Sequence, residues 1–408
     1  MGRRDSLRAF AGAVSKRHGA GSLTMGSRVA DIPRLRTGAL LFDVALGGGL
    51  PIGRVTMFMG EKSSGKTTAA YMIGGLAQKL CANCYRPVDT EIDVEEVDGE
   101  EEFFQTGHCD CYKTGLFEPR QYPDEKNDEY KARIAEYESS GSSYSEFRVA
   151  LLDVEGSFDR VWAAKQGLDE RLIVYSRPST AEEAVDIYDG LARTGSVDLM
   201  ILDSIAQMTP SKEVEDSTEN WQQGLQARLV NKLSRKCGSA NSDVKRDFGI
   251  DLTHIWVNQF REKIGVMFGP KEVVPGGKGQ GFLTSVEVKM WASQYDVGTV
   301  VELPGKESDF EIASSARMNF KVEKNKTAPA KGRGSYVLDL RTGKIVDDSL
   351  MVALAEKFGF LRKESATKWF LGDDAHKTKT AAIGDLLGDK RVVYYGMFLE
   401  LMLRGKAA

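Results

Sequence analysis

One glycine-rich loop constrains the fold of this chain more than any other feature of its sequence. It matches G-x-x-x-x-G-K-[ST] at every fixed position and lies between an apolar run, residues 55–59, and a helical stretch, residues 68–80. In this context the backbone N–H groups of the loop point at phosphate oxygens. Lys66 is expected to reach the β- and γ-phosphates of a nucleotide, and the Thr67 hydroxyl to ligate Mg²⁺. The expected phosphate-binding residues are Gly60, Glu61, Lys62, Ser63, Ser64, Gly65, Lys66, Thr67 and Thr68.

Two later apolar runs end in carboxylates. Residues 199–202 lead into Asp203, which is the Walker B arrangement, and residues 149–154 lead into Glu155. Open α/β sheets bind their ligands at the edge where the carboxyl ends of parallel strands meet. We therefore expect Asp203 to hold Mg²⁺ through water, and Glu155 to be the base that orients an attacking water.

Short apolar runs alternate with amphipathic helices along much of the chain. Helices are predicted over residues 181–193 and 224–236, and a further strand over residues 255–257. This alternation predicts an α/β fold whose mostly parallel central sheet has helices on both faces.

The chain divides into three expected parts. An N-terminal oligomerisation segment holds a short amphipathic helix at residues 5–18, which has to bury its apolar face against the core or a neighbouring subunit. An ATPase-like core follows, and the tail reads as a small separate domain. The expected limits are 1–35, 36–344 and 345–408, with an insertion at 81–147.

The overall charge does not point to a nucleic-acid partner. The formal net charge is −4 over 408 residues, so DNA contacts would have to come from local basic patches. The chain has no apolar stretch near the ~18 residues that a membrane helix needs. Its first residues formally match myristoylation and twin-arginine patterns, but no apolar signal core follows them. A cytoplasmic protein without a membrane partner is expected.

The insertion interrupts the regular alternation with polar sequence and two cysteine pairs. Cys81 and Cys84 form a C-x-x-C pair, and Cys109 and Cys111 form a C-x-C pair after His108. Such pairs suit tetrahedral Zn²⁺, with His108 as a substitute ligand, and four free cysteines in a reducing cytosol are the alternative. The acidic run at residues 89–102 is either a solvated spacer or, as a weaker hypothesis, a DNA mimic or a docking site for a basic partner.

Several stretches together closely resemble the bacterial RecA family. They are residues 60–68, 153–155, 197–204 and 257–269, with further matches at 16–22, 37–52 and 324–326. The resemblance implies a RecA-like P-loop ATPase core with an N-terminal polymerisation helix and a small C-terminal α+β domain. It also implies a DNA-dependent ATPase and homologous recombinase, which uses ATP and Mg²⁺. The insertion and the missing acidic tail mark a divergent member, of the kind that phages encode.

The resemblance assigns further residues to the nucleotide. Asp159 and Trp162 stand where the family contacts adenine, with Trp162 in place of the usual tyrosine. Gln259 matches the residue that senses the γ-phosphate and relays the nucleotide state to a DNA loop. Lys324 and Lys326 match a pair that reaches the ATP of the neighbouring subunit, as an arginine finger supplied in trans does. Hydrolysis would then require a filament.

The resemblance also implies DNA contacts from two segments. Residues 211–220 lead into a helix with a basic face, and residues 261–281 form a glycine-rich basic loop. Basic side chains and glycine N–H groups suit phosphate binding, and exposed apolar residues can wedge between bases. The first segment departs from the family at Trp221, which either stacks on a base or packs on the core. The expected DNA-binding residues are Arg228, Arg235, Arg261, Lys263, Ile264, Met267, Gly276, Gly277 and Lys278.

The family's activity implies partners: single-stranded DNA, homologous double-stranded DNA, a homo-oligomeric helical filament, and mediator or single-strand-binding proteins. Two other classes of function compete with this reading. One is a RecA-fold motor, such as a hexameric helicase or a RadA-like branch-migration protein, which can also carry zinc cysteines. Those cysteines normally precede the core, whereas here they interrupt it. The other is a non-catalytic scaffold that binds ATP as a switch, against which Lys66, Glu155 and Asp203 argue.

Overall fold

A computed structural model gives the arrangement of most of the chain. The residues it describes are 9–10, 12–14, 16–17, 32–97, 100–109, 111, 126–140, 145–212, 224–262, 272–277, 279–297, 313–329, 332–365 and 367–404.

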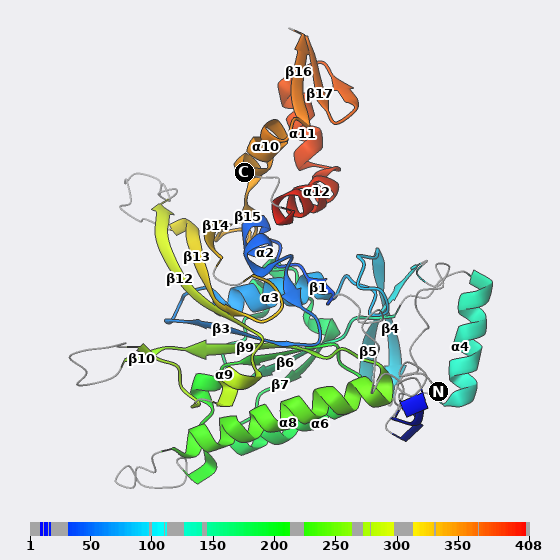
Figure 1. Cartoon of the computed structure of the whole chain (residues 1–408), viewed down its shortest axis with the longest axis vertical. Helices are drawn as coiled ribbons and strands as arrows, with labels where there is room; N and C mark the ends of the chain where they lie inside the picture. Colours follow the sequence, from blue (N-terminus) through cyan, green and yellow to red (C-terminus); the bar gives the residue numbers. More distant parts are fainter. Residues whose placement is uncertain are drawn as a thin grey trace.

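A nine-stranded sheet forms the centre of the molecule (Figure 1). Its strands are β3 (Val55–Gly60), β6 (Val149–Asp153), β7 (Ile173–Ser176), β8 (Leu199–Asp203), β9 (Thr253–Gln259), β12 (Val286–Val297), β13 (Ala313–Asn325), β14 (Arg333–Asp339) and β15 (Ile345–Val346). They lie in the order β15-β14-β13-β12-β3-β9-β8-β6-β7. The half from β12 to β7 pairs in parallel, and the half from β12 to β15 pairs antiparallel.

The parallel half of the sheet is covered on both faces. Every residue of β3, β6 and β8 is buried, which explains why these strands are continuous apolar runs without alternation. One face packs on α2 (Leu40–Leu46) and α3 (Lys66–Ala77), and the other on α6 (Ala181–Arg193) and α8 (Leu225–Phe248). The two helix layers are visible above and below the sheet in Figure 1.

The predicted α/β fold is confirmed. Residues 181–193 form α6 with the expected bounds, while the helix expected at 224–236 continues to Phe248. The strand expected at 255–257 is the centre of the longer β9. The long antiparallel strands β12 and β13 were not predicted. Polar residues alternate with buried ones along them, so they lack the continuous apolar runs that marked the other strands.

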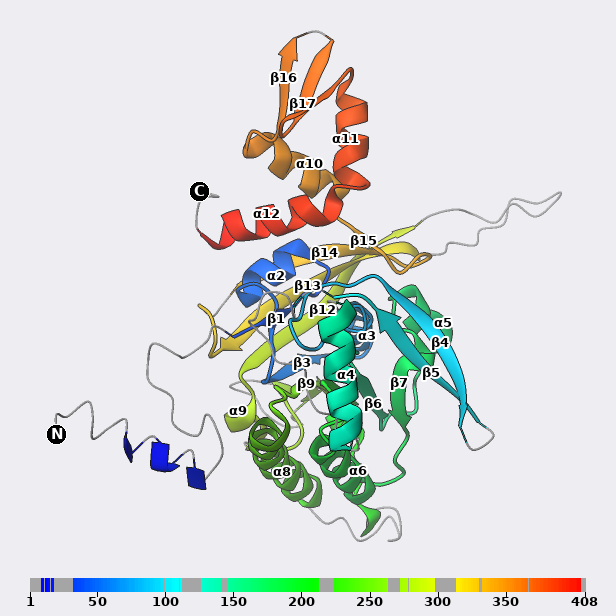
Figure 2. The ribbon, with the colours of Figure 1, turned by 90° about the vertical axis from the view of Figure 1, so that its right-hand side faces the viewer.

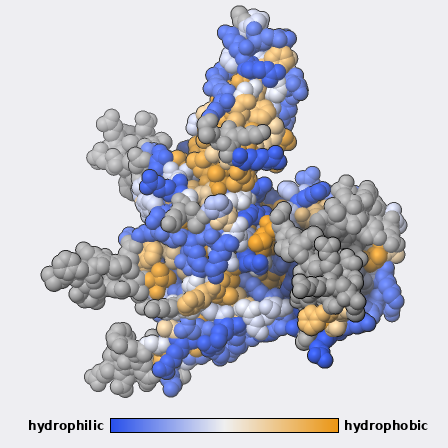
Figure 3. Space-filling view, viewed as in Figure 1, coloured by the Kyte–Doolittle hydropathy of each residue, from blue (hydrophilic) through white to orange (hydrophobic). Residues whose placement is uncertain are grey.

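The C-terminal residues form an α+β unit with its own apolar cluster. It contains α10 (Asp348–Lys357), β16 (Leu361–Ser365), β17 (Lys368–Leu371), β18 (Asp374–His376), α11 (Lys379–Leu387) and α12 (Arg391–Leu403). Leu40 of α2 joins this cluster, and Tyr395 of α12 donates a hydrogen bond of 2.7 Å to the buried Asp43 of α2. Apolar surface gathers where these helices meet the core (Figure 3).

The insertion forms a two-stranded hairpin and a helix on one side of the core (Figure 2). The hairpin pairs β4 (Thr90–Val97) with β5 (Glu100–Gly107), and α4 (Asn127–Ser140) follows. Near the N-terminus, residues 9–10, 12–14 and 16–17 are helical, as predicted, and Phe10 is 62 % exposed. No helix in the described part of the chain is long and apolar enough to span a membrane.

Candidate functional site

The glycine-rich loop connects β3 to α3 at the carboxyl edge of the parallel strands. Gly65 precedes the helix with a φ of 82°, in the left-handed region that favours glycine. A Cβ on Gly60 would lie 2.3 Å from the carbonyl oxygen of Met290 on β12, so a larger residue does not fit there. The two glycines of the motif are therefore required by the local backbone and by the neighbouring strand.

Lys66, Thr67 and Asp203 lie together beneath the loop. The Lys66 ammonium donates hydrogen bonds to the carbonyl oxygen of Glu61 (2.6 Å) and to the Ser64 hydroxyl (3.0 Å). Thr67 Oγ1 donates to Asp203 Oδ2 across 2.5 Å. Burial lowers the pKa of Lys66. Burial, reinforced by neighbouring carboxylates, raises the pKa of Asp203 to about 6, so this carboxylate favours a cationic ligand.

Glu155 faces this group from the loop that follows β6. Its carboxylate accepts a hydrogen bond of 3.0 Å from Gln259 Nε2 and one of 3.4 Å from the Ser204 hydroxyl. The N–H groups of Val154 and Glu155 donate to the carbonyl oxygen of Asp203 at 2.7 and 3.2 Å, and the Asp203–Ser204 peptide bond is cis. Residues from the ends of β6, β8 and β9 thus converge on one point.

Two residues that organise this point were not predicted from the sequence. One is Ser204, which contacts Glu155. The other is Asp153, whose carboxylate accepts hydrogen bonds from the N–H groups of Gly156 (2.8 Å) and Ser157 (3.1 Å). The only sequence signal for Asp153 is an acid at the end of an apolar strand. Glu155 shares that signal, so the pattern alone does not separate the acid that folds the loop from the one that faces the site.

A cavity of about 320 Å³ is lined by Lys66, Thr67, Asp203, Glu155 and Gln259. Trp162 of α5 (Arg160–Lys165) lines it too, and its Nε1 donates to Thr68 Oγ1 across 3.1 Å. Asp159 caps α5 by accepting a hydrogen bond from the Trp162 N–H (3.0 Å) and is not among the lining residues. The lining residues are Lys62, Ser63, Ser64, Gly65, Lys66, Thr67, Thr68, Glu155, Ser157, Trp162, Asp203, Val257, Gln259, Tyr295, Met318, Leu338 and Leu340.

Lys324 and Lys326 lie outside this cavity, at the end of β13. The Lys324 ammonium lies 3.2 Å from Thr284 Oγ1 and 3.3 Å from the Glu287 carboxylate. Lys326 donates to the carbonyl oxygen of Phe282 across 2.8 Å. Within one subunit, the two lysines are therefore held beside α9 (Gly279–Leu283) and not at the phosphate loop.

Comparison with known proteins decides the family. The RecA N-terminal domain matches residues 6–98 and 133–337. Proteins named RecA from Mycobacterium sp. strains KMS and JLS are each 30 % identical over 361 residues, which cover 88 % of this chain and 79 % of each relative. The chain belongs to the RecA family. Members of the RecA family are DNA-dependent ATPases. The family match leaves out residues 99–132, within the predicted insertion.

The first of the two segments for which the RecA resemblance implies DNA contacts leads into α8. Arg228 and Arg235 are exposed on this helix. Lys236 of the same helix pairs with Asp189 at 3.0 Å, whereas the two arginines have no ion-pair partner among the described residues. At the helix start, Gln226 donates to the carbonyl oxygen of Ala206 (3.1 Å), which lies shortly after Asp203. This contact ties the segment to the nucleotide side of the sheet.

The second segment begins directly after Gln259. Arg261 starts β10 (Arg261–Glu262), which pairs with β11 (Glu272–Val273). Gly276 and Gly277 have φ of 96° and 76°, and a Cβ on Gly276 would lie 2.8 Å from Val230 of α8. The two segments therefore meet at α8. Of the predicted contacts, Lys263, Ile264, Met267 and Lys278 lie outside the described residues, as does Trp221.

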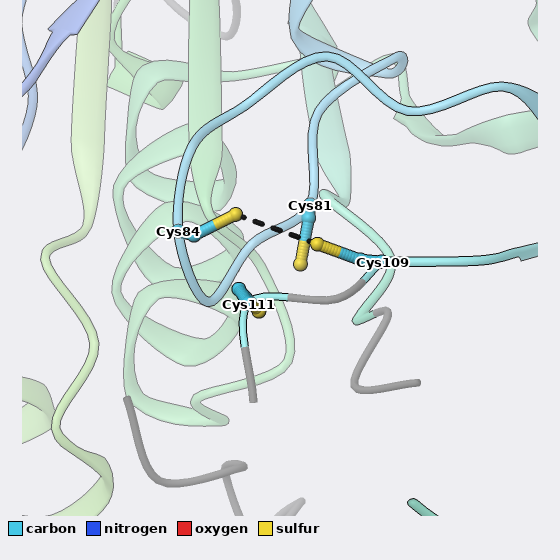
Figure 4. A group of neighbouring side chains, drawn as sticks. All are labelled: Cys81, Cys84, Cys109 and Cys111. Carbon is cyan, nitrogen blue, oxygen red and sulfur yellow. Dashed lines mark hydrogen bonds between the residues drawn. The ribbon is translucent and has the colours of Figure 1, made fainter. Parts of the chain in front are cut away.

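The four cysteines of the insertion come together at one place (Figure 4). The Sγ atoms of Cys81, Cys84, Cys109 and Cys111 all lie within 4.8 Å of one another. Cys84 Sγ and Cys109 Sγ are 3.6 Å apart, and the group forms a small cluster of its own apart from the main core. His108 is exposed, and the metal-ligand set that the structure assembles consists of the four thiols.

Proposed function

We propose that this RecA-family protein is a DNA-dependent ATPase and homologous recombinase, which polymerises on single-stranded DNA and exchanges it with homologous double-stranded DNA. The observation that carries the proposal is the position of Gln259. Its side chain contacts Glu155 inside the phosphate cavity, and β10 of the second DNA segment begins two residues later. A change at the γ-phosphate therefore has a short covalent path to the DNA contacts.

The residues of the cavity fit ATP and Mg²⁺. Thr67 and Asp203 offer hard oxygen ligands, and Asp203 Oδ1 is buried without a hydrogen-bond partner among the described residues. Such an orphaned oxygen suits a magnesium ion or one of its waters. The ion would neutralise phosphate charge, while Lys66 would hold the β- and γ-phosphates.

Glu155 is proposed to take a proton from the attacking water. Its carboxylate is half-buried, and Gln259 and Ser204 fix its orientation. A base held in this way acts without a reorientation step. The half-buried indole of Trp162 offers a face for the adenine ring, and Asp159 orients it by capping α5.

A filament is proposed because Lys324 and Lys326 do not reach the phosphate cavity of their own subunit. Lys324 and Lys326 are bound beside α9 and are free to serve the next subunit only if they leave these contacts. The exposed Phe10 of the N-terminal helix offers an apolar side chain for contact with a neighbouring subunit.

One set of assays tests the proposal. Hydrolysis of ATP is measured with and without single-stranded DNA, and the same mixtures are imaged by electron microscopy. We expect stimulation by DNA, filaments that require nucleotide, and joint molecules when a homologous duplex is added. Unwinding of a duplex without pairing would favour the motor, and ATP binding without turnover would favour the scaffold.

A further inference from the structure

The four-cysteine cluster joins two segments that are distant in sequence. Cys81 and Cys84 lie on a tight turn shortly after α3, the helix that begins at the phosphate loop. Within this turn the Tyr85 N–H donates to the carbonyl oxygen of Cys81 (2.7 Å). Cys109 and Cys111 follow β5, at the base of the acidic hairpin (Figure 4). A group bound by all four thiols would therefore fasten the hairpin to the end of the phosphate-loop helix.

The spacing of the sulfur atoms suits a single tetrahedral ion. With Zn–S bonds of about 2.3 Å, the edges of a ZnS₄ tetrahedron are about 3.8 Å long. The 3.6 Å between Cys84 Sγ and Cys109 Sγ matches such an edge, and the 4.8 Å limit on the whole group requires little adjustment. An iron–sulfur cluster puts several atoms between its thiolates and would hold them further apart.

The surroundings of the cluster are built to keep four ligands in place. Cys81, Cys109 and Cys111 are buried, and few apolar side chains pack against the group. Cys81 forms a β-bridge with Glu146, and the Ala82 N–H donates to the carbonyl oxygen of Ser145 (2.7 Å). The chain thus returns to the cysteine turn where the insertion ends. The four thiols therefore lie where the two ends of the insertion meet, and an ion bound to all four would join these ends.

The pairing of β4 with β5 is weakly stabilised by its own side chains. Its register sets Glu95 opposite Glu102 and Glu96 opposite Glu101, and like charges in these positions repel. Val94 and Val97 of β4 are 55 % and 40 % exposed, and on β5 the half-buried Phe103 contacts the Arg171 guanidinium, 5.7 Å from its ring centroid. A two-stranded hairpin of this kind is marginal in water and needs an anchor at its base.

We propose that Cys81, Cys84, Cys109 and Cys111 bind a structural Zn²⁺ ion, which anchors the acidic β4–β5 hairpin to the C-terminal end of α3. Each thiol loses its proton to solvent as the ion binds, so four Zn–S bonds form and four protons are released with no change in oxidation state. All four positions are filled by thiolates, so the ion has no open site for catalysis. Two of the four ligands, Cys109 and Cys111, fall in residues 99–132, which the family match leaves out.

Metal content tests the proposal independently of any ATPase or DNA activity. The full chain is purified under reducing conditions without added metal or chelator and analysed by elemental mass spectrometry. We expect about one equivalent of zinc per chain, released by a mercurial reagent that titrates thiolates. Less than about half an equivalent of zinc, or iron in its place, overturns the proposal. So does a count of disulfides among the four cysteines in place of metal.

Two variants connect the metal to these residues. Cys109→Ser with Cys111→Ser removes the C-x-C pair and should abolish zinc binding. Cys237→Ser is the matched control, because Cys237 is buried in the main core on α8 and should leave the zinc content unchanged. Equal zinc in the double variant and the control contradicts the assignment. Should the double variant fail to fold, the metal content and stoichiometric zinc release of the unmodified chain still decide.

Limited proteolysis tests whether the zinc ion anchors the β4–β5 hairpin. A glutamate-specific protease cuts the hairpin at residues such as Glu95 and Glu102 only when the strands open locally. We expect cleavage in the hairpin to accelerate at least about tenfold after zinc is removed, while the central sheet stays folded by circular dichroism. Unchanged cleavage after zinc removal would refute the role as an anchor.

Discussion

Gln259 Nε2 donates a hydrogen bond of 3.0 Å to the carboxylate of Glu155, and this contact joins the last residue of β9 to the loop after β6. Glu155 also contacts Ser204, directly after the Asp203 that bonds Thr67. The proposed base, the proposed γ-phosphate sensor and the magnesium ligands therefore form one connected group. A disturbance at Gln259 reaches the base directly and the β10 strand through the chain.

Gln259→Ala should separate ATP hydrolysis from DNA binding. The variant keeps the phosphate loop but loses the contact between Glu155 and the end of β9. We expect basal hydrolysis within about tenfold of the unmodified protein and a stimulation by single-stranded DNA that falls to about one. The measurement is the ratio of the ATP hydrolysis rate with single-stranded DNA to the rate without it. A ratio equal to that of the unmodified protein would show that Gln259 relays nothing.

Glu155→Gln should slow turnover without weakening the binding of ATP. The amide keeps the shape and can still accept from Gln259, but it cannot take a proton from water. We expect kcat to fall by about 10²-fold or more, the usual worth of a general base. Glu400→Gln is the control, since Glu400 is an exposed acid on α12 and lies outside the residues that line the cavity. Normal turnover in Glu155→Gln removes the proposed role.

The parallel half of the fold could be predicted from sequence because its strands are buried on both faces. Residues 149–153 and 199–203 are apolar runs that end in an acid. This pattern can be recognised from the sequence alone. The strands β12 and β13 show no such run. Their buried residues alternate with polar outward ones, as Ala316, Met318, Phe320 and Val322 do in β13, so neither strand forms a continuous apolar run.

The candidate site was predictable where a residue type is demanded by local backbone. Gly65, whose positive φ favours glycine, belongs to this group. Gly60 and the acids at strand ends were predicted from their positions in sequence motifs. The contact of Ser204 with Glu155 was not predictable, because it depends on how two separate strand ends meet. The approach of the two cysteine pairs was expected from their spacing, whereas the hairpin between them and its opposed glutamates follow from a strand register that the acidic run does not reveal.

Subunits with complementary defects should restore activity together if Lys324 acts in trans. Lys66→Ala destroys the phosphate loop but keeps Lys324, and Lys324→Ala has the opposite defect. Each alone should lose about 10²-fold or more of its DNA-stimulated ATPase activity. An equal mixture of the two variants should hydrolyse ATP several-fold faster than the sum of the rates measured for each variant alone. A mixture that gives only the sum, in filaments shown to contain both variants, would contradict an active site shared between subunits.

His254 should make the fold less stable in mild acid. It is buried in β9, where its Nδ1 lies 2.5 Å from the Tyr188 hydroxyl and its Nε2 lies 2.6 Å from Asn241 Oδ1. The Asn241 oxygen can only accept, so the ring carries its proton on Nε2 and accepts from Tyr188 on Nδ1. Tyr188 in turn accepts from Trp256 Nε1 across 2.8 Å. A second proton on the ring has no acceptor in this network.

Burial accordingly lowers the pKa of His254 to about 3, from an ordinary value of 6.5. The unfolded chain then binds more protons than the folded one between these values, so stability is full above about pH 6.5 and falls as the pH drops towards 3. One proton is worth about 1.4 kcal/mol per pH unit, which gives a loss of about 3 kcal/mol at pH 4.5. Urea unfolding at several pH values between 7.5 and 4.5 measures this loss in the free energy of unfolding.

His254→Gln isolates this contribution, because glutamine does not titrate. The variant should be less stable at pH 7.5, since it loses part of the buried network, but the gap to the unmodified protein should narrow as the pH falls. Asp43 and Asp203, whose pKa values burial raises to about 6, change stability in the opposite direction and do so equally in both proteins. Their effect cancels in the difference. A gap that stays constant from pH 7.5 to pH 4.5 would mean that His254 is protonated in the folded chain, and the hydrogen-bond assignment of its ring would then be wrong.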